Sequence, residues 1–198
     1  MRVRPAKVAV VSLVYLCVAA LYLAFFIFPV SPAEPTDTFS YEVEERTYRA
    51  LPNIHEMVYT NGKAFLAIAT VRTISAPNSA YSAAFDRLDG YAENYARDQY
   101  GVEIEVREES RDDSFVFSGH TGVKFVFGIH KDMVVGFPPF ETTQSLKVAE
   151  LGAIAWFCNV DFESVILFYV TPLYFADDPS LSDLSSQLTS MVSEVRCH

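Results

Sequence analysis

Residues Val148 to Thr171, VAELGAIAWFCNVDFESVILFYVT, contain the strongest strand signal in the sequence. The two apolar runs, Val148–Cys158 and Phe162–Thr171, have the length of strands and are rich in β-branched and aromatic residues. The turn residues Asn159-Val160-Asp161 between them predict an antiparallel hairpin. Because both runs are almost continuously apolar, we expect the hairpin to be covered on both faces.

Two more hairpins are expected on the N-terminal side of this stretch. Glu56–Thr60 and Lys63–Val71 flank Asn61-Gly62, which supplies the positive φ angles of a type I′ turn. The alternating segment Val102–Arg107 predicts a half-buried strand, and Glu108–Asp113 predicts a charged turn. Ser114–Ser118 and Val123–Ile129 then form the third hairpin across Gly119–Gly122. Met133–Val135 predicts one more short strand, and Gly136–Gln144 predicts a loop.

Two helices are expected. The first spans Ser79 to Tyr100, with Asn78 or Ser79 as its N-cap and Gly101 as its end. Apolar residues recur in it at steps of three and four. The second begins at Pro179 after an Asp178 cap and carries a stripe of Leu181, Leu184, Leu188, Met191, Val192 and Val195.

Strands in a run with few, separate helices predict an α+β fold. We expect an antiparallel sheet with a helix on each face, an α/β/α-type sandwich, preceded by one N-terminal transmembrane helix. The expected domain boundaries are a cytoplasmic N-terminus at 1–7, a transmembrane anchor at 8–30, a linker at 31–38 and an extracytoplasmic α+β domain at 39–198.

The anchor is predicted from Val8–Val30, 23 residues without a charge. As a helix this segment would be about 35 Å long, against about 30 Å for the bilayer core. Arg2, Arg4 and Lys7 precede it, so the positive-inside rule places the N-terminus in the cytoplasm and the C-terminal domain outside. We therefore expect a signal-anchor and a single-pass location in the cell membrane, with the lipid bilayer as partner of residues 8–30.

Three alternatives to the anchor remain open. Ser31-Pro32-Ala33 has small residues at the spacing of a signal-peptidase site, although the apolar segment is longer than usual for a cleaved signal. Cys17 could be lipidated, but it lies in the middle of the segment. The segment could also be a buried helix of a soluble domain, although such helices are shorter and carry polar residues.

Composition excludes two broad classes of protein. With 51% hydrophobic residues the chain can bury a core, so wholesale disorder is excluded. Its formal net charge of -10 is unsuited to binding phosphate backbones, so nucleic acid is not an expected partner.

Residues that could perform chemistry occur without a catalytic or metal-binding pattern. Ser118-Gly119-His120 places a hydroxyl near a histidine but among turn residues, and His130 follows at the other end of the returning strand. His55-Glu56 lacks the second histidine of H-E-x-x-H. The acid pairs Glu108-Glu109, Asp112-Asp113 and Asp177-Asp178 predict solvated turns, with a weak cation site at either Asp pair as the alternative. We therefore assign no catalytic residue, metal ligand or cofactor, and the cofactor-binding residues stay unknown.

Two further groups of side chains are of interest. Cys158 and Cys197 can form a disulfide that pins the last helix to the sheet; the alternative is two unpaired thiols. The first expected helix carries Tyr81, Tyr91, Tyr95 and Tyr100, which either form the rim of its core-facing stripe or line a ligand groove.

The strand AFLAIATV at Ala64–Val71 and its following helix, the hairpin SFVFSGHTGVKFVFGI at Ser114–Ile129, and the Val148–Thr171 hairpin with its closing helix resemble the PsbP-like fold. That fold is named for an extrinsic subunit of the photosynthetic oxygen-evolving complex and occurs in membrane-tethered bacterial and archaeal proteins. The resemblance implies a non-catalytic module. We expect an anchored extracytoplasmic binding or assembly module with an envelope protein as partner. The alternatives are a surface domain that binds a small ligand or cation, and a hydrolase with His120 or His130 as base.

Overall fold

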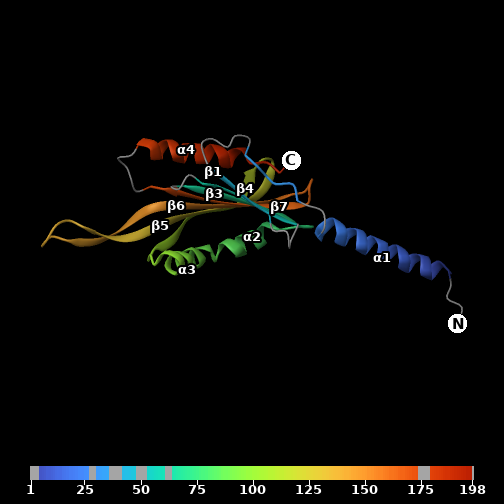
Figure 1. The fold of residues 1–198 in the computed structure, drawn as a ribbon. Coiled ribbons are helices and arrows are strands. Elements are labelled where there is room, and N and C mark those ends of the chain that lie inside the picture. The colour runs from blue at the N-terminus through green and yellow to red at the C-terminus, as the bar shows by residue number, and fades with distance from the viewer. Residues whose placement is uncertain are drawn as a thin grey trace.

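The protein is built on one seven-stranded antiparallel sheet with the strand order β1-β2-β3-β7-β6-β5-β4 (Figure 1). The structure, a computed structural model, describes residues 5–26, 30–35, 42–47, 53–60, 64–173 and 179–197. Its elements are α1 (Pro5–Phe26), β1 (Glu42–Thr47), β2 (Ile54–Thr60), β3 (Phe65–Arg72), α2 (Asn78–Phe85), α3 (Leu88–Tyr100), β4 (Glu105–Phe117), β5 (His120–Val135), β6 (Thr142–Cys158), β7 (Glu163–Pro172) and α4 (Pro179–Glu194).

The three expected hairpin pairings are confirmed. β2 pairs with β3, β4 with β5, and β6 with β7, each antiparallel. The Asn61-Gly62 turn and the Asp178 cap lie outside the described residues. The strands with continuous apolar sequence, β3, β7 and β6, are neighbours in the sheet. This position suits them because central strands can be covered on both faces.

The expected charged turn at Glu108–Asp113 is wrong, since β4 runs through it. Two irregularities in register, at Glu108/Ser110 and Asp112/Phe115, let the strand continue despite the broken alternation of its sequence. The acidic side chains of this part of β4 are exposed. β4 is an edge strand of the sheet, and its exposed charges disfavour pairing with a strand of another molecule.

The sheet buries apolar side chains on both faces. One cluster joins Trp156, Leu167 and Ile68 to Leu188 and Met191 of α4. The other joins Phe125, Phe127 and Ala153 to Tyr81 and Phe85 of α2. Alternate residues of β6 belong to different clusters, as a strand with period two requires.

The predicted helix–sheet–helix sandwich is nevertheless wrong. The single helix expected from Ser79 to Tyr100 is broken at Asp86 and Arg87 into α2 and α3. Of these two helices α2 buries three residues, whereas α3 buries none. The sheet also extends beyond the helices at the far end of β5 and β6 (Figure 1). The fold is therefore a large antiparallel sheet with short helices against parts of it, not a stack of complete layers.

The predicted transmembrane anchor, the signal-anchor and the single-pass membrane location are also wrong. Over the described ranges no helix is both long enough and apolar enough to cross a membrane. Val30 is instead buried in the domain. α1 projects away from the sheet, and its side chains from Val10 to Leu23 are exposed (Figure 1).

Residues 30–35, within the expected linker, lie against the domain. The Ala33 N–H donates to Thr70 Oγ1 over 3.1 Å, and both residues are buried. Glu34 forms an isolated β-bridge with Arg196. Residues 30–35 precede the sheet in sequence. These contacts hold them against β3 and beside the C-terminal tail.

Candidate functional site

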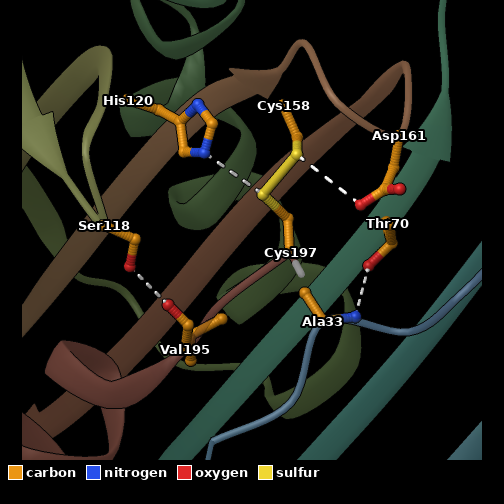
Figure 2. The surroundings of a disulfide bond; sticks show 8 residues. All are labelled: Ala33, Thr70, Ser118, His120, Cys158, Asp161, Val195 and Cys197. Carbon is orange, nitrogen blue, oxygen red and sulfur yellow. Dashed lines mark hydrogen bonds between the residues drawn. A yellow bond between two sulfur atoms is a disulfide. The ribbon is translucent and has the colours of Figure 1, made fainter.

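A disulfide between Cys158 and Cys197 joins the end of β6 to the tail that follows α4 (Figure 2). The two Cα atoms are 6.4 Å apart, and 39 residues separate the cysteines in sequence. Both residues are buried, at 0% and 8% exposure. The structure thus brings together the two cysteines that sequence analysis considered as a pair, and it links the last segment of the chain to the sheet.

His120 lies beside this disulfide because of the tight turn before it. Ser118 and Gly119 have φ angles of 48° and 81°, so two residues suffice to reverse the chain, and β5 begins at His120. Its Nε2 is 3.5 Å from Cys197 Sγ (Figure 2). Ser118 Oγ donates to the Val195 carbonyl over 2.8 Å and holds the tail against the turn. The observed turn, Ser118-Gly119, is therefore shorter than the predicted turn at Gly119–Gly122.

Asp161 approaches the disulfide from the opposite side. It belongs to the turn between β6 and β7, and its Oδ2 is 3.8 Å from Cys158 Sγ (Figure 2). The potential ligand atoms of His120, Cys158 and Cys197 all lie within 4.8 Å of one another. The β4–β5 turn, the end of β6 and the chain end therefore bring an imidazole and two sulfurs into one cluster, with the Asp161 carboxylate beside Cys158 on its other side.

The cluster is reached from a surface hollow of about 420 Å³, lined by Ser118, His120, Ser193, Arg196 and Cys197. Ser118 and His120 are not arranged as a nucleophile and its base. Nucleophilic catalysis requires the serine proton to be engaged by a base. The Ser118 hydroxyl is instead engaged by a main-chain carbonyl, and the His120 imidazole approaches Cys197.

His130, the other base considered, lies at the far end of the β4–β5 pair from His120. His130 is opposite Glu105 in the register, and His120 is opposite Phe117. Ten residues of strand separate the two rings by about 33 Å. His130 contributes to a different hollow of about 560 Å³, which it shares with Glu103, Glu105, Asp132 and Ser145 among others. The two histidines do not share a site, as expected.

The other candidate residues in the described ranges are buried or form hydrogen bonds and ion pairs within the fold. His55 is buried on β2. Asp113 accepts hydrogen bonds from Arg111 and Ser82, which lower the pKa of its carboxyl group. Asp112 accepts from the main chain and hydroxyl of Ser114, and Glu109 pairs with Lys147. Asp177 and Asp178 lie outside the described residues.

The four tyrosines do not form a groove. Tyr81 is buried and donates to Ser164 Oγ over 2.6 Å, and its burial raises the pKa of its hydroxyl group. Tyr91, Tyr95 and Tyr100 are exposed on α3, at 67%, 59% and 70%. The stripe that periodicity assigned to the core is therefore divided between a buried α2 and an exposed α3.

A second candidate site, at the end of the sheet, was not predicted from the sequence. β5 pairs with β4 only as far as His130, and β6 pairs with β7 only from Ala149. Beyond these points Lys131–Val135 and Thr142–Leu146 pair with each other and with no other described strand. We call residues 131–146 the β5–β6 arm. It is the part of the sheet that projects farthest from the helices (Figure 1).

Two aromatic side chains occupy the tip of the β5–β6 arm. Gly136, at φ 115°, begins the turn, and the Phe140 N–H donates to the Phe137 carbonyl over 2.6 Å. The Phe137 and Phe140 rings pack edge to face with their centroids 5.9 Å apart. They are 69% and 72% exposed, so they cover each other but not the core. The sequence signal for this feature was Pro138-Pro139, and it indicated a loop.

Comparison with known protein families and with curated proteins found no match for this chain.

Proposed function

We propose that the protein is a non-catalytic binding module that holds a protein partner through the β5–β6 arm. The exposed pair Phe137 and Phe140 is the observation that carries the proposal. Large aromatic side chains at the centre of an interface commonly supply most of its binding energy. Exposed aromatic rings on a projecting element are therefore suited to enter a pocket of another protein.

The shape of the arm supports the same conclusion. Each of its strand segments has five residues, so it reaches about 17 Å beyond the last residues that pair with β4 or β7. An isolated two-stranded hairpin is only marginally stable in water. Its main-chain edges and its apolar side chains Val134 and Val135 are open to a partner. Binding would cover the arm and order it at the same time.

A different protein suits the arm better than a second copy of this chain. Three hollows on the described surface are lined largely by polar and charged side chains, including Glu103, His130, Arg196 and Asp113. Two phenyl rings require an apolar pocket. The described surface of a second copy does not supply a matching one at these hollows. The resemblance to the PsbP-like fold also supports a non-catalytic module.

The test combines capture with a measured affinity. A photoreactive phenylalanine analogue at position 140 of the full-length protein, in its native cells, should crosslink to one protein, whereas the analogue at Val116 on exposed β4 should not. The identified partner is then purified. We expect Phe137→Ser and Phe140→Ser each to weaken its binding by about 30-fold or more, since such anchors contribute about 2 kcal/mol or more.

Ile74→Ser is the matched control, because Ile74 is 69% exposed and lies outside the arm. It should bind with the affinity of the unmodified protein. Equal affinity of the arm variants and the control would overturn the proposal. Crosslinks only between copies of this chain would show that the partner is a second copy instead.

A further inference from the structure

We propose that reduction of the Cys158–Cys197 disulfide converts its surroundings into a zinc site with Cys158, Cys197, His120 and Asp161 as ligands. The disulfide and the metal ion would be alternative links between the chain end and the sheet. The proposal does not depend on the β5–β6 arm, which lies at the opposite end of β5.

Two separations between donor atoms already have the values that a tetrahedral zinc ion requires. Zinc lies about 2.3 Å from sulfur and about 2.0 Å from nitrogen, which places tetrahedral S and N ligands roughly 3.5 Å apart. His120 Nε2 and Cys197 Sγ are 3.5 Å apart. A sulfur and a carboxylate oxygen require nearly the same spacing, and Cys158 Sγ and Asp161 Oδ2 are 3.8 Å apart.

Two adjustments remain. Asp161 must turn towards the ion, because it lies on the side of the disulfide opposite His120. The second adjustment concerns the two sulfurs. In a zinc site they would lie roughly 3.8 Å apart, and once the S–S bond is broken rotation about each Cα–Cβ bond can separate them. The backbone already brings the two Cα atoms to 6.4 Å. The four donors come from the β4–β5 turn, the end of β6, the β6–β7 turn and the tail after α4. Three of these are anchored to the sheet, so most of the site is held in place before metal binds.

The donor chemistry favours zinc over harder cations. Two thiolates and an imidazole are soft or borderline ligands, which select zinc instead of magnesium or calcium. Two thiolates and one carboxylate carry three negative charges. The Zn²⁺ ion compensates two of them, so one negative charge remains. Arg196 lines the same hollow as His120 and can offset this charge. The hollow also provides a path by which an ion could enter.

The conversion requires a dithiol reductant. The S–S bond accepts two electrons and two protons and becomes two thiols, while the two thiols of the reductant become a disulfide. Zinc then displaces one proton from each cysteine thiol, so two protons are released as two Zn–S bonds form. His120 binds through the lone pair of neutral Nε2.

The test measures zinc binding by the full-length protein in both redox states. The protein is reduced with a dithiol, the reductant is removed under nitrogen, and zinc is titrated against a chromophoric chelator. We expect the reduced protein to bind one zinc ion and the oxidised protein to bind none at this site. Cobalt should give the thiolate charge-transfer and intense visible bands of a tetrahedral site with sulfur ligands.

Variants that retain the disulfide identify the ligands. His120→Gln should weaken zinc binding by about 100-fold and Asp161→Asn by about 10-fold, whereas the matched controls His130→Gln and Asp132→Asn should not change it. Thermal melting of each oxidised variant shows that it folds. Zinc should also raise the melting temperature of the reduced protein.

Three results would overturn the proposal. The first is no stoichiometric zinc binding to the reduced protein. The second is unchanged affinity in both His120→Gln and Asp161→Asn. The third is a reduced protein that loses its fold and does not regain it when zinc is added.

Discussion

Gly152 of β6 lies directly opposite Tyr169 of β7, and the tyrosine ring occupies the space that a β-carbon at position 152 would need. Burial of this ring raises the pKa of Tyr169 to about 12. The pair shows how the central strands approach each other: a large ring on one strand requires a residue without a side chain on the next.

Gly152→Ala should therefore destabilise the protein by about 2 kcal/mol, because overpacking of a filled core has that order of cost. Urea unfolding followed by circular dichroism measures the change. Gly90→Ala is the control, since a β-carbon at that position on α3 would meet nothing within 4 Å. The control should be neutral or stabilising by up to about 1 kcal/mol. Equal stabilities of the two variants would show that Tyr169 moves aside without cost.

Loss of the disulfide should lower the free energy of unfolding by about 4 kcal/mol on the chain-entropy estimate for a loop of this length. The double variant Cys158→Ser/Cys197→Ser, compared with the oxidised protein by urea unfolding, gives the value. Cys17 is a free, exposed cysteine, so Cys17→Ser should leave the stability unchanged. A double variant as stable as the oxidised protein would show that the tail is held by its packing alone.

The contact between Ala33 and Thr70 should contribute measurably to stability. Thr70→Val keeps the side-chain volume but removes the acceptor of the buried Ala33 N–H. We expect a loss of about 1 to 3 kcal/mol, the cost of leaving a buried donor unsatisfied. Thr121→Val, at an exposed position of β5, is the control and should change stability little. If Thr70→Val behaves like this control, residues 30–35 do not depend on the hydrogen bond.

Glu163 should make the protein less stable as the pH rises through the pKa of its carboxyl group. The side chain is 1% exposed and pairs with Arg72 over 3.2 Å. Burial raises the pKa of Glu163 above its usual value, since the opposing effects of Arg72 and the Ser31 main chain do not cancel it; Asp161 raises it further. The folded protein therefore binds this proton more tightly than the unfolded chain, and the stabilisation is lost as the proton leaves.

The measurement compares the unfolding free energy of the protein with that of Glu163→Gln from pH 4 upward. The difference, unmodified protein minus variant, should decrease as the pH rises above about 4.5, the ordinary pKa of a glutamate. An increase over this range would mean that Arg72 lowers the pKa of Glu163 below its usual value.

Periodicity predicted the elements whose burial is uniform along their length. β3 and the β6–β7 hairpin could be predicted because their sequences are apolar on both faces. The break between α2 and α3 could not, because the apolar spacing continues from Phe85 to Leu88 while tertiary contacts differ: Asp86 pairs with Arg111 of β4.

The two candidate sites depend on contacts that sequence patterns do not record. His120 and Cys197 are 77 residues apart, and only the fold brings them to 3.5 Å. The β5–β6 arm was missed because Thr142–Lys147 is polar and was assigned partly to a loop. An exposed two-stranded arm has no buried face, so its sequence carries little of the alternation by which strands are recognised.

Amide hydrogen exchange of the full-length protein, with and without the partner identified by crosslinking, tests whether the β5–β6 arm binds that partner. We expect exchange to slow at residues 131–146, most strongly near Phe137 and Phe140, because the partner covers the open edges of the arm. Unchanged exchange in the arm, with slowed exchange elsewhere on the protein, would contradict the claim.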